Sequence, residues 1–191
     1  NTKANSYLFL DDLENARTVL EDLLKIDSEN VNALINMAQI LKKEYNYEDS
    51  LTYLDRALEV DPQSSDALML KGDALFHLFR YDEAKECIDR SFEMSDDNAY
   101  VWYLKGECES HFENHEKAVE YYTRAIEIDP AFEKCYYDLA ICQIILGRPE
   151  EAKAAFRKIF EMNPDSYEEG RAELADEIVD MMSQHFPKKD D

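Results

Sequence analysis

The stretch WYLKGECESHFENHEKAVEYYTRAIEIDP, residues 102–130, contains the packing unit on which the rest of the chain is patterned. Trp102 and Gly106 stand four residues apart, so they share one face of a helix. The small residue lets a second helix approach closely, and the large one fills the space beside it. Pro130 cannot continue a helix and closes the stretch. We therefore predict two helices packed against each other over these residues.

The same pattern recurs with a step of 34 residues. Pro62, Pro130 and Pro164 follow this step, since 62 to 130 is twice 34 and 130 to 164 is 34, and Asp96 takes the missing place. The step also produces two columns of large residues and one column of small residues. These columns are Leu34, Leu68, Trp102 and Tyr136; Leu54, Ile88, Tyr122 and Phe156; and Ala38, Gly72, Gly106 and Ala140. A helix pair repeated at one period predicts a stacked repeat array.

The spacing W-x2-L/K-G…A-x3-Y…A-x4-P resembles the tetratricopeptide repeat. It is read at Trp102, Lys105, Gly106, Ala118, Tyr122, Ala125 and Pro130. The resemblance implies an all-α fold, a right-handed α-solenoid of antiparallel helix pairs. The expected parts are a partial unit over 1–30, full units over 31–64, 65–98, 99–132 and 133–166, a capping helix over 167–186 and a tail over 187–191.

The expected capping helix has its own apolar stripe. Leu174, Ile178, Met181 and Met182 recur at helical spacing. A solenoid must cover the apolar face of its last unit, so we expect this segment to pack there. The charged residues 187–191 are expected to be a disordered tail.

Composition and charge narrow the classes of partner and of chemistry. The chain has 191 residues, a formal net charge of -22 and only 4 glycines and 5 prolines, which favours helices. This charge repels nucleic acids and anionic lipids and attracts basic partners. There is no apolar run long enough to cross a membrane and no signal-peptide pattern. The four cysteines form no C-x-x-C pair, so we expect buried, reduced thiols and a cytoplasmic protein.

The resemblance also implies a concave groove that is lined by the first helix of each repeat and holds a peptide or a partner helix. The residues that carry over are Ile35, Asn36, Gln39, Asp66, Met69, Leu70, Asp73, His77, Tyr100, Tyr103, Leu104, Glu107, His111, Lys134, Tyr137, Asp138 and Ile141. Aromatic residues beside carboxylates suit a ligand with apolar and basic side chains. Another interpretation stays open, in which Tyr100, Tyr103 and Tyr137 pack between repeats.

Several more specific sites are disfavoured. Members of the family that clamp acidic chaperone tails use Lys and Arg, whereas only the asparagines Asn5 and Asn36 fit that clamp here. Two acid–histidine pairs, Asp73 with His77 and Glu107 with His111, are better explained as surface pairs than as metal ligands. No nucleotide-binding, hydrolase or metalloprotease motif occurs, so we expect no catalytic residues, no cofactor and no metal.

The sequence therefore predicts a non-enzymatic adaptor that binds a peptide or a partner helix of another protein. Two alternatives stay open. The chain could be a self-association module that uses its uncapped first unit or its methionine-bearing last helix. It could also be the docking or regulatory arm of an enzyme whose catalytic domain is not in this chain.

Overall fold

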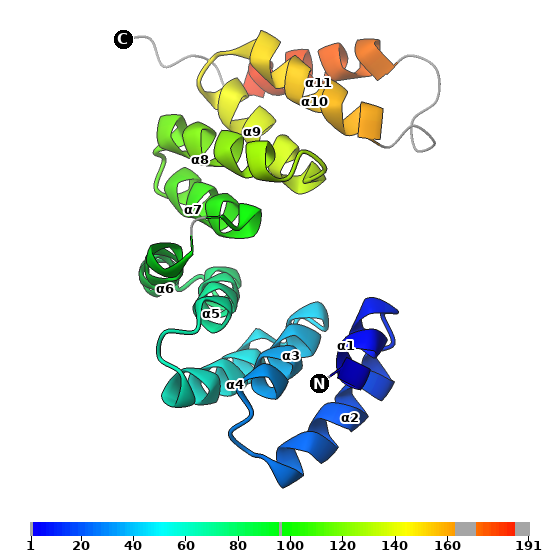
Figure 1. Cartoon of the computed structure of the whole chain (residues 1–191). Helices are drawn as coiled ribbons and strands as arrows, with labels where there is room; N and C mark the ends of the chain where they lie inside the picture. The colour runs from blue at the N-terminus through cyan, green and yellow to red at the C-terminus, as the bar shows by residue number, and fades with distance from the viewer. Residues whose placement is uncertain (1, 96, 163–170, 186–191) are drawn as a thin grey trace. The chain divides into compact units, whose positions relative to one another are not determined.

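The computed structural model describes residues 2–95, 97–162 and 171–185, and over these residues all regular structure is α-helical (Figure 1). The helices are α1 (Thr2–Phe9), α2 (Leu13–Ile26), α3 (Val31–Lys43), α4 (Tyr47–Val60), α5 (Ser65–His77), α6 (Tyr81–Met94), α7 (Ala99–His111), α8 (His115–Ile128), α9 (Glu133–Ile145), α10 (Pro149–Met162) and α11 (Arg171–His185). The predicted all-α class is confirmed. None of these described helices is long and apolar enough to cross a membrane.

Some predicted features lie outside the described residues. They are Asn1, Asp96, Pro164, the two ends of the expected capping helix at 167–170 and 186, and the expected tail over 187–191. The same holds for the side chain of Leu174, one member of the apolar stripe. The remaining stripe residues lie on α11.

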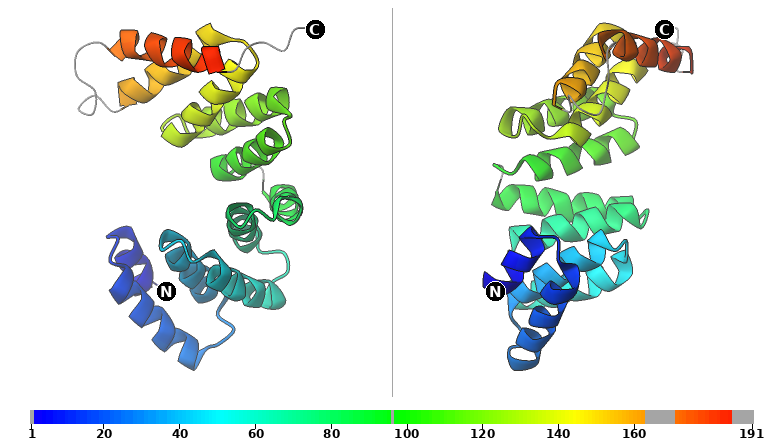
Figure 2. Two further views of the ribbon diagram at one scale, coloured as in Figure 1. Left: turned by 180° about the vertical axis from the view of Figure 1, so that it is seen from behind. Right: turned by 90° about the vertical axis from the view of Figure 1, so that its right-hand side faces the viewer.

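The chain divides into two compact units, Asn1–Ser95 and Asp96–Asp191. The first unit contains α1 to α6, which pack as the consecutive pairs α1–α2, α3–α4 and α5–α6 (Figure 2). Polar side chains begin its helices: Asn30 accepts a hydrogen bond from the Ala33 N–H at 3.1 Å, and Ser64 accepts one from the Ala67 N–H at 3.4 Å. Apolar residues of α3, α4 and α5 form one of its buried clusters, in which Leu34 and Leu54 are fully buried.

The second unit contains α7 to α11. Its pairs are α7–α8 and α9–α10, and α11 packs mainly against α10 and less against α9 (Figure 2). Two ion pairs join α10 to α11: Arg157 Nη2 lies 2.8 Å from Asp176 Oδ1, and Lys153 Nζ lies 3.6 Å from Asp180 Oδ1. Ala175 and Val179 of α11 are fully buried in a core shared with α9 and α10. The buried face of α11 therefore packs on the last repeat, as we expect for a capping helix.

Close helix approach at the small-residue column is confirmed at two glycines. A Cβ placed on Gly72 would lie 2.5 Å from Ile88 Cγ1, and one placed on Gly106 would lie 2.4 Å from Tyr122 Cε1. At both positions a methyl group would force the neighbouring side chain to shift. The large residue of the second helix therefore packs directly on the backbone of the first helix, as the columns predict.

Candidate partner-binding site

The first unit carries part of the predicted groove. The residues concerned are Ile35, Asn36 and Gln39 on α3, and Asp66, Met69, Leu70, Asp73 and His77 on α5. Ile35 and Leu70 belong to the core and are closed to a partner. Asp66 and His77 are exposed, whereas Asn36, Gln39 and Met69 are half-buried. The Asn36 amide donates to Asn5 Oδ1 at 2.7 Å, so the surface of α3 is polar and internally bonded.

Asp73 is the most buried charge of the first unit, with only 1 % of its surface exposed. The ammonium group of Lys42 pairs with one of its carboxylate oxygens, and His77 Nε2 lies 3.5 Å from the other. The His77 ring also stacks on Tyr47, with ring centroids 4.7 Å apart. The prediction of a surface acid–histidine pair is therefore wrong for Asp73, which serves an internal ion pair and is not presented to a ligand.

The second unit carries the other predicted residues. They are Tyr100, Tyr103, Leu104, Glu107 and His111 on α7, and Lys134, Tyr137, Asp138 and Ile141 on α9. Tyr103 and Leu104 are fully buried, whereas Tyr137 keeps half of its surface exposed. Tyr100, Glu107, Asp138 and Ile141 are half-buried, and His111 and Lys134 are exposed. Among the three tyrosines singled out from the sequence, Tyr137 is therefore the most accessible to a partner.

Tyr103 packs inside the second unit, as the alternative interpretation of the tyrosines proposed. Its ring lies 4.9 Å from that of Phe132 and 5.8 Å from those of Tyr100 and Tyr122. Its hydroxyl donates a hydrogen bond to Asp138 Oδ2 at 2.9 Å. Burial, and next the nearby Glu107 carboxylate, raise the pKa of Tyr103 far above its ordinary value. The phenol therefore stays protonated and holds the Asp138 carboxylate in place.

Electrostatics around Asp138 are set mainly by desolvation. Burial raises the pKa of Asp138 above its ordinary value, and the Tyr103 hydrogen bond and the Lys134 charge oppose that rise. The Lys134 ammonium is shared, since it lies 4.9 Å from the centre of the Tyr103 ring and 3.3 Å from Glu107 Oε1. The N-terminal part of α9 thus offers a carboxylate, and its neighbouring cation is already engaged.

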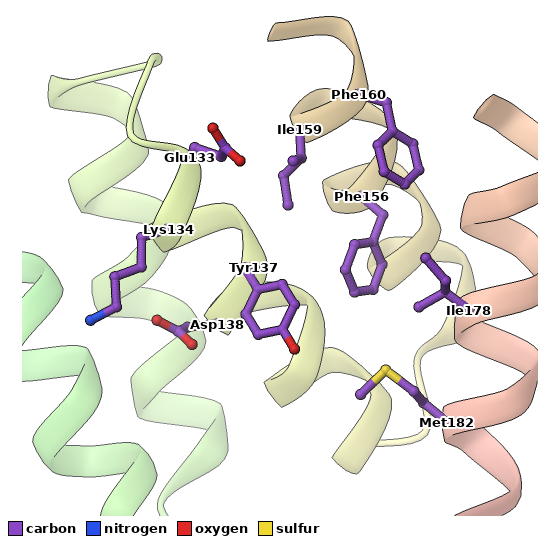
Figure 3. A pocket seen from close by; sticks show the side chains of 9 residues that line it. All are labelled: Glu133, Lys134, Tyr137, Asp138, Phe156, Ile159, Phe160, Ile178 and Met182. Atoms are coloured by element: carbon purple, nitrogen blue, oxygen red, sulfur yellow. The ribbon is translucent and has the colours of Figure 1, made fainter. Parts of the chain in front are cut away.

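A cavity of about 790 Å³ opens beside these residues, between α9, α10 and α11 (Figure 3). It is lined by Glu133, Lys134, Tyr137, Asp138, Phe156, Ile159, Phe160, Ile178 and Met182. Figure 3 shows α9 and α11 on either side of it, with the α10 side chains between them. The Tyr137 ring meets the Phe156 ring edge-on, with centroids 5.9 Å apart. The space is therefore apolar within and polar along its α9 edge.

Sequence reasoning located one wall of this cavity and missed the other two. Lys134, Tyr137 and Asp138 were among the predicted groove residues. Phe156 belongs to a predicted packing column, and Ile178 and Met182 belong to the predicted stripe of a capping helix. The signal was present, because all three are large apolar residues on faces that meet α9. The repeat period does not predict how far α9 and α11 lie apart.

The described residues contain no group of three or more His, Cys, Asp or Glu side chains placed to hold a metal ion. All four cysteines are buried, as predicted. Burial raises the pKa of Cys135 to about 12 and also raises that of Cys142, so neither thiol is activated by its surroundings. What the cavity can do chemically is to shelter apolar side chains beside a carboxylate.

Stacked helix pairs of this kind define a helical-repeat protein. One sequence model of the tetratricopeptide repeat matches residues 41–108 and 112–176, and a second such model matches residues 1–30. The chain therefore belongs to the tetratricopeptide repeat family, and the predicted α-solenoid class is confirmed. Proteins of this family generally mediate protein–protein interactions.

Solved structures agree on the fold. PilW, described as a widely conserved type IV pilus biogenesis factor, has a TM-score of 0.76 at 20% identity, over 95% of this chain and 89% of its own. A thermophilic tetratricopeptide repeat protein of Thermus thermophilus has a TM-score of 0.74 at 17% identity, over 93% and 95%. YrrB, described as having an unusual peptide-binding site, has a TM-score of 0.66 at 21% identity, over 86% and 84%. No curated protein matches the sequence.

Proposed function

We propose that this protein is a non-enzymatic adaptor that binds a peptide or a partner helix of another protein. The observation that carries the proposal is the cavity between α9, α10 and α11, which is large enough for a ligand and keeps a half-exposed tyrosine at its edge. Its volume of about 790 Å³ falls in the range of roughly 300–1,000 Å³ that is usual for ligand pockets. The four buried, free thiols are compatible with the cytoplasmic location that we also propose.

The cavity lining favours an apolar anchor with a basic neighbour. Phe156, Ile159 and Phe160 supply buried apolar surface, which suits a Leu, Met or aromatic side chain of the partner. Asp138 and Glu133 supply carboxylates along the α9 edge. An amphipathic helix presents such anchors at positions i, i+3 or i+4, and a Lys or Arg beside them would meet these carboxylates.

Tyr137→Ala tests the proposal, because this ring is half exposed and contributes to the cavity edge. Phe112→Ala is a matched control: it removes an aromatic ring that is 40% exposed in the same unit but does not line the cavity. Proteins retained from a lysate by the wild type and by the control should be lost by Tyr137→Ala. An aromatic anchor of this kind is worth about 2 kcal/mol, or roughly 30-fold in Kd.

Isothermal titration with each purified partner then measures the affinity. A second variant, Met182→Trp, adds bulk to the cavity from its α11 side and keeps both Glu133 and Asp138, and it should weaken the binding of the same partners. Equal affinity of the wild type and both cavity variants for every retained partner would show that the cavity is not the binding site. Light scattering of the isolated protein separates this adaptor function from self-association.

A further inference from the structure

Two aromatic residues of the first unit have a backbone conformation that favours glycine. Tyr45 and Phe79 both have φ of 62°, in the turns that follow α3 and α5. A Cβ at such an angle crowds the following carbonyl, and a bulky residue there is a real outlier. The same repeat position has a positive φ in other turns as well, at Asp11 (56°), Glu113 (60°) and Gly147 (69°), so the left-handed conformation belongs to the turn. What distinguishes Tyr45 and Phe79 from the other residues at this position is a bulky aromatic side chain, for which a positive φ is least favourable.

Packing does not account for these two residues. Tyr45 is 80% exposed and Phe79 is 77% exposed, so neither ring contributes much to a core. Large apolar groups that stay in water gain little of the free energy that burial would give them. Strain together with exposure points to a role outside the folding of this chain.

The two rings are the exposed ends of a continuous series that we call the aromatic ridge: Tyr45, Tyr47, His77, Phe76, Tyr81 and Phe79. From Tyr45 onward, the neighbouring ring centroids are separated by 6.5, 4.7, 6.4, 5.1 and 6.1 Å. Tyr47, Phe76 and Tyr81 are half-buried, so the middle of the ridge is held by the fold. The ridge therefore offers a fixed aromatic surface along the turns of α3–α4 and α5–α6.

Acidic residues border the ridge. Glu48 and Asp82 directly follow Tyr47 and Tyr81 in the first turns of α4 and α6, and both are exposed. Neither forms an ion pair within the part of the chain that the structure describes. The nearby Arg80 is engaged, since its Nη2 lies 2.6 Å from Glu83 Oε2. The free charge along the ridge is therefore negative.

We infer that the aromatic ridge binds a basic segment of a protein, with Arg or Lys side chains lying over the exposed rings of Tyr45 and Phe79. The face of an aromatic ring attracts a cation, and guanidinium groups also stack on it. Glu48 and Asp82 add charge pairing beside the rings. The same carboxylates and the net charge of -22 repel phosphate, which disfavours a nucleic acid or an anionic membrane as the occupant.

The ridge and the cavity share no residue, so this inference stands independently of the proposed adaptor cavity. The ridge lies on α3 to α6 and their turns in the first unit, whereas the cavity lies on α9 to α11 in the second. The two surfaces can therefore be altered by separate variants.

The test uses the full chain and a fluorescent peptide of alternating Arg and Gly, followed by fluorescence anisotropy. The decisive variant is Tyr45→Gly with Phe79→Gly, which leaves the net charge unchanged and relieves both strained turns. We expect the peptide to bind this variant about tenfold more weakly than the wild type, while Tm stays equal or rises. Phe112→Ala, which removes an exposed ring that belongs to neither the ridge nor the cavity, should bind the peptide like the wild type.

Glu48→Gln with Asp82→Asn tests the acidic border, and it should weaken binding and reduce its dependence on salt. Equal affinity of the wild type and the double glycine variant would mean that the peptide follows net charge alone, and this would overturn the inference. So would failure of the wild type to bind the peptide at low salt. A single-stranded oligonucleotide or phosphatidylserine vesicles that bind the wild type, and are lost in the double glycine variant, would reassign the ridge to that other class.

Discussion

Gly106→Ala probes the contact on which the repeat packing depends. The new Cβ would lie 2.4, 2.5 and 3.0 Å from three atoms of the Tyr122 ring. Comfortable carbon–carbon contact is about 3.5–4.0 Å, so the overlap reaches about 1 Å at two atoms. The ring has little room to move, because Tyr122 is 1% exposed and packs against Tyr103 with centroids 5.8 Å apart. We therefore expect the variant to be destabilised.

Two opposing effects set the size of this change. Alanine is favoured over glycine inside a helix by about 1 kcal/mol. Overpacking a full core costs about 1–3 kcal/mol, and a clash with a rigid ring belongs at the upper end of that range. The net loss is therefore about 2 kcal/mol. With a urea m-value of about 2 kcal/mol/M, the unfolding midpoint should fall by about 1 M.

Trp102 gives this experiment a local reporter. It is the only tryptophan in the chain and lies on α7, the helix that carries Gly106. Its fluorescence in urea follows the second unit, and far-UV circular dichroism follows the whole chain. Both signals should show the earlier midpoint, and the spectra in buffer should be unchanged.

A double-mutant cycle separates the clash from helix propensity. Tyr122→Leu opens a cavity and costs stability by itself. Combined with Gly106→Ala, it recreates the pair Ala38 and Leu54, which packs in the core of the first unit. The double variant should lose about 1–2 kcal/mol less than the sum of the two single variants. Additive losses, or a Gly106→Ala protein that is more stable than the wild type, would refute the packing argument.

Three further changes should alter stability in defined directions. Asn30→Ala removes the helix cap on α3 and should cost about 1 kcal/mol in urea unfolding followed by circular dichroism; no change would contradict the cap. Lys42→Met removes the cation that pairs with the buried Asp73 and should lower the free energy of unfolding by about 1–3 kcal/mol. A higher free energy of unfolding in the same urea titration would show that the ion pair is not needed for stability. Asp138 has a folded-state pKa above its ordinary value, so the native state binds more protons and wild-type stability falls as pH rises from the ordinary to the raised pKa. Asp138→Asn should therefore be more stable than the wild type at neutral pH, with the difference vanishing below about pH 4, and an unchanged pH profile would contradict the desolvation argument.

The repeat pattern predicted the packing of the core because packing positions recur. Gly106 faces Tyr122, and Gly72 faces Ile88, at the places that the size columns indicate. Such pairs follow from the period and from the sizes of the side chains alone. The predicted groove residues were less informative, because one helix position can be core in one repeat and surface in another. Tyr103 is fully buried, whereas Tyr137, one repeat later, is half exposed.

The cavity could not be derived from the same pattern. Its far wall depends on how α11 lies against α10, which the buried residues Ala175 and Val179 and the ion pair from Arg157 to Asp176 determine. An apolar stripe indicates that a helix packs, but it does not specify what the helix leaves uncovered. The same helix therefore serves two purposes. Ala175 and Val179 pack into the core, whereas Ile178 and Met182 line the cavity.

The backbone conformation of the turns is a second feature, after the cavity, that the repeat pattern does not predict. Tyr45 and Phe79 stand at one position of the repeat, 34 residues apart, and that position holds a glycine at 147. The comparison of these three residues could have flagged the turns, but only the backbone angles show that the aromatic residues are strained there. Core positions tolerate few changes, because each contacts its neighbours closely. Turn and cavity positions tolerate many, so variants there are expected to change binding while leaving the fold intact.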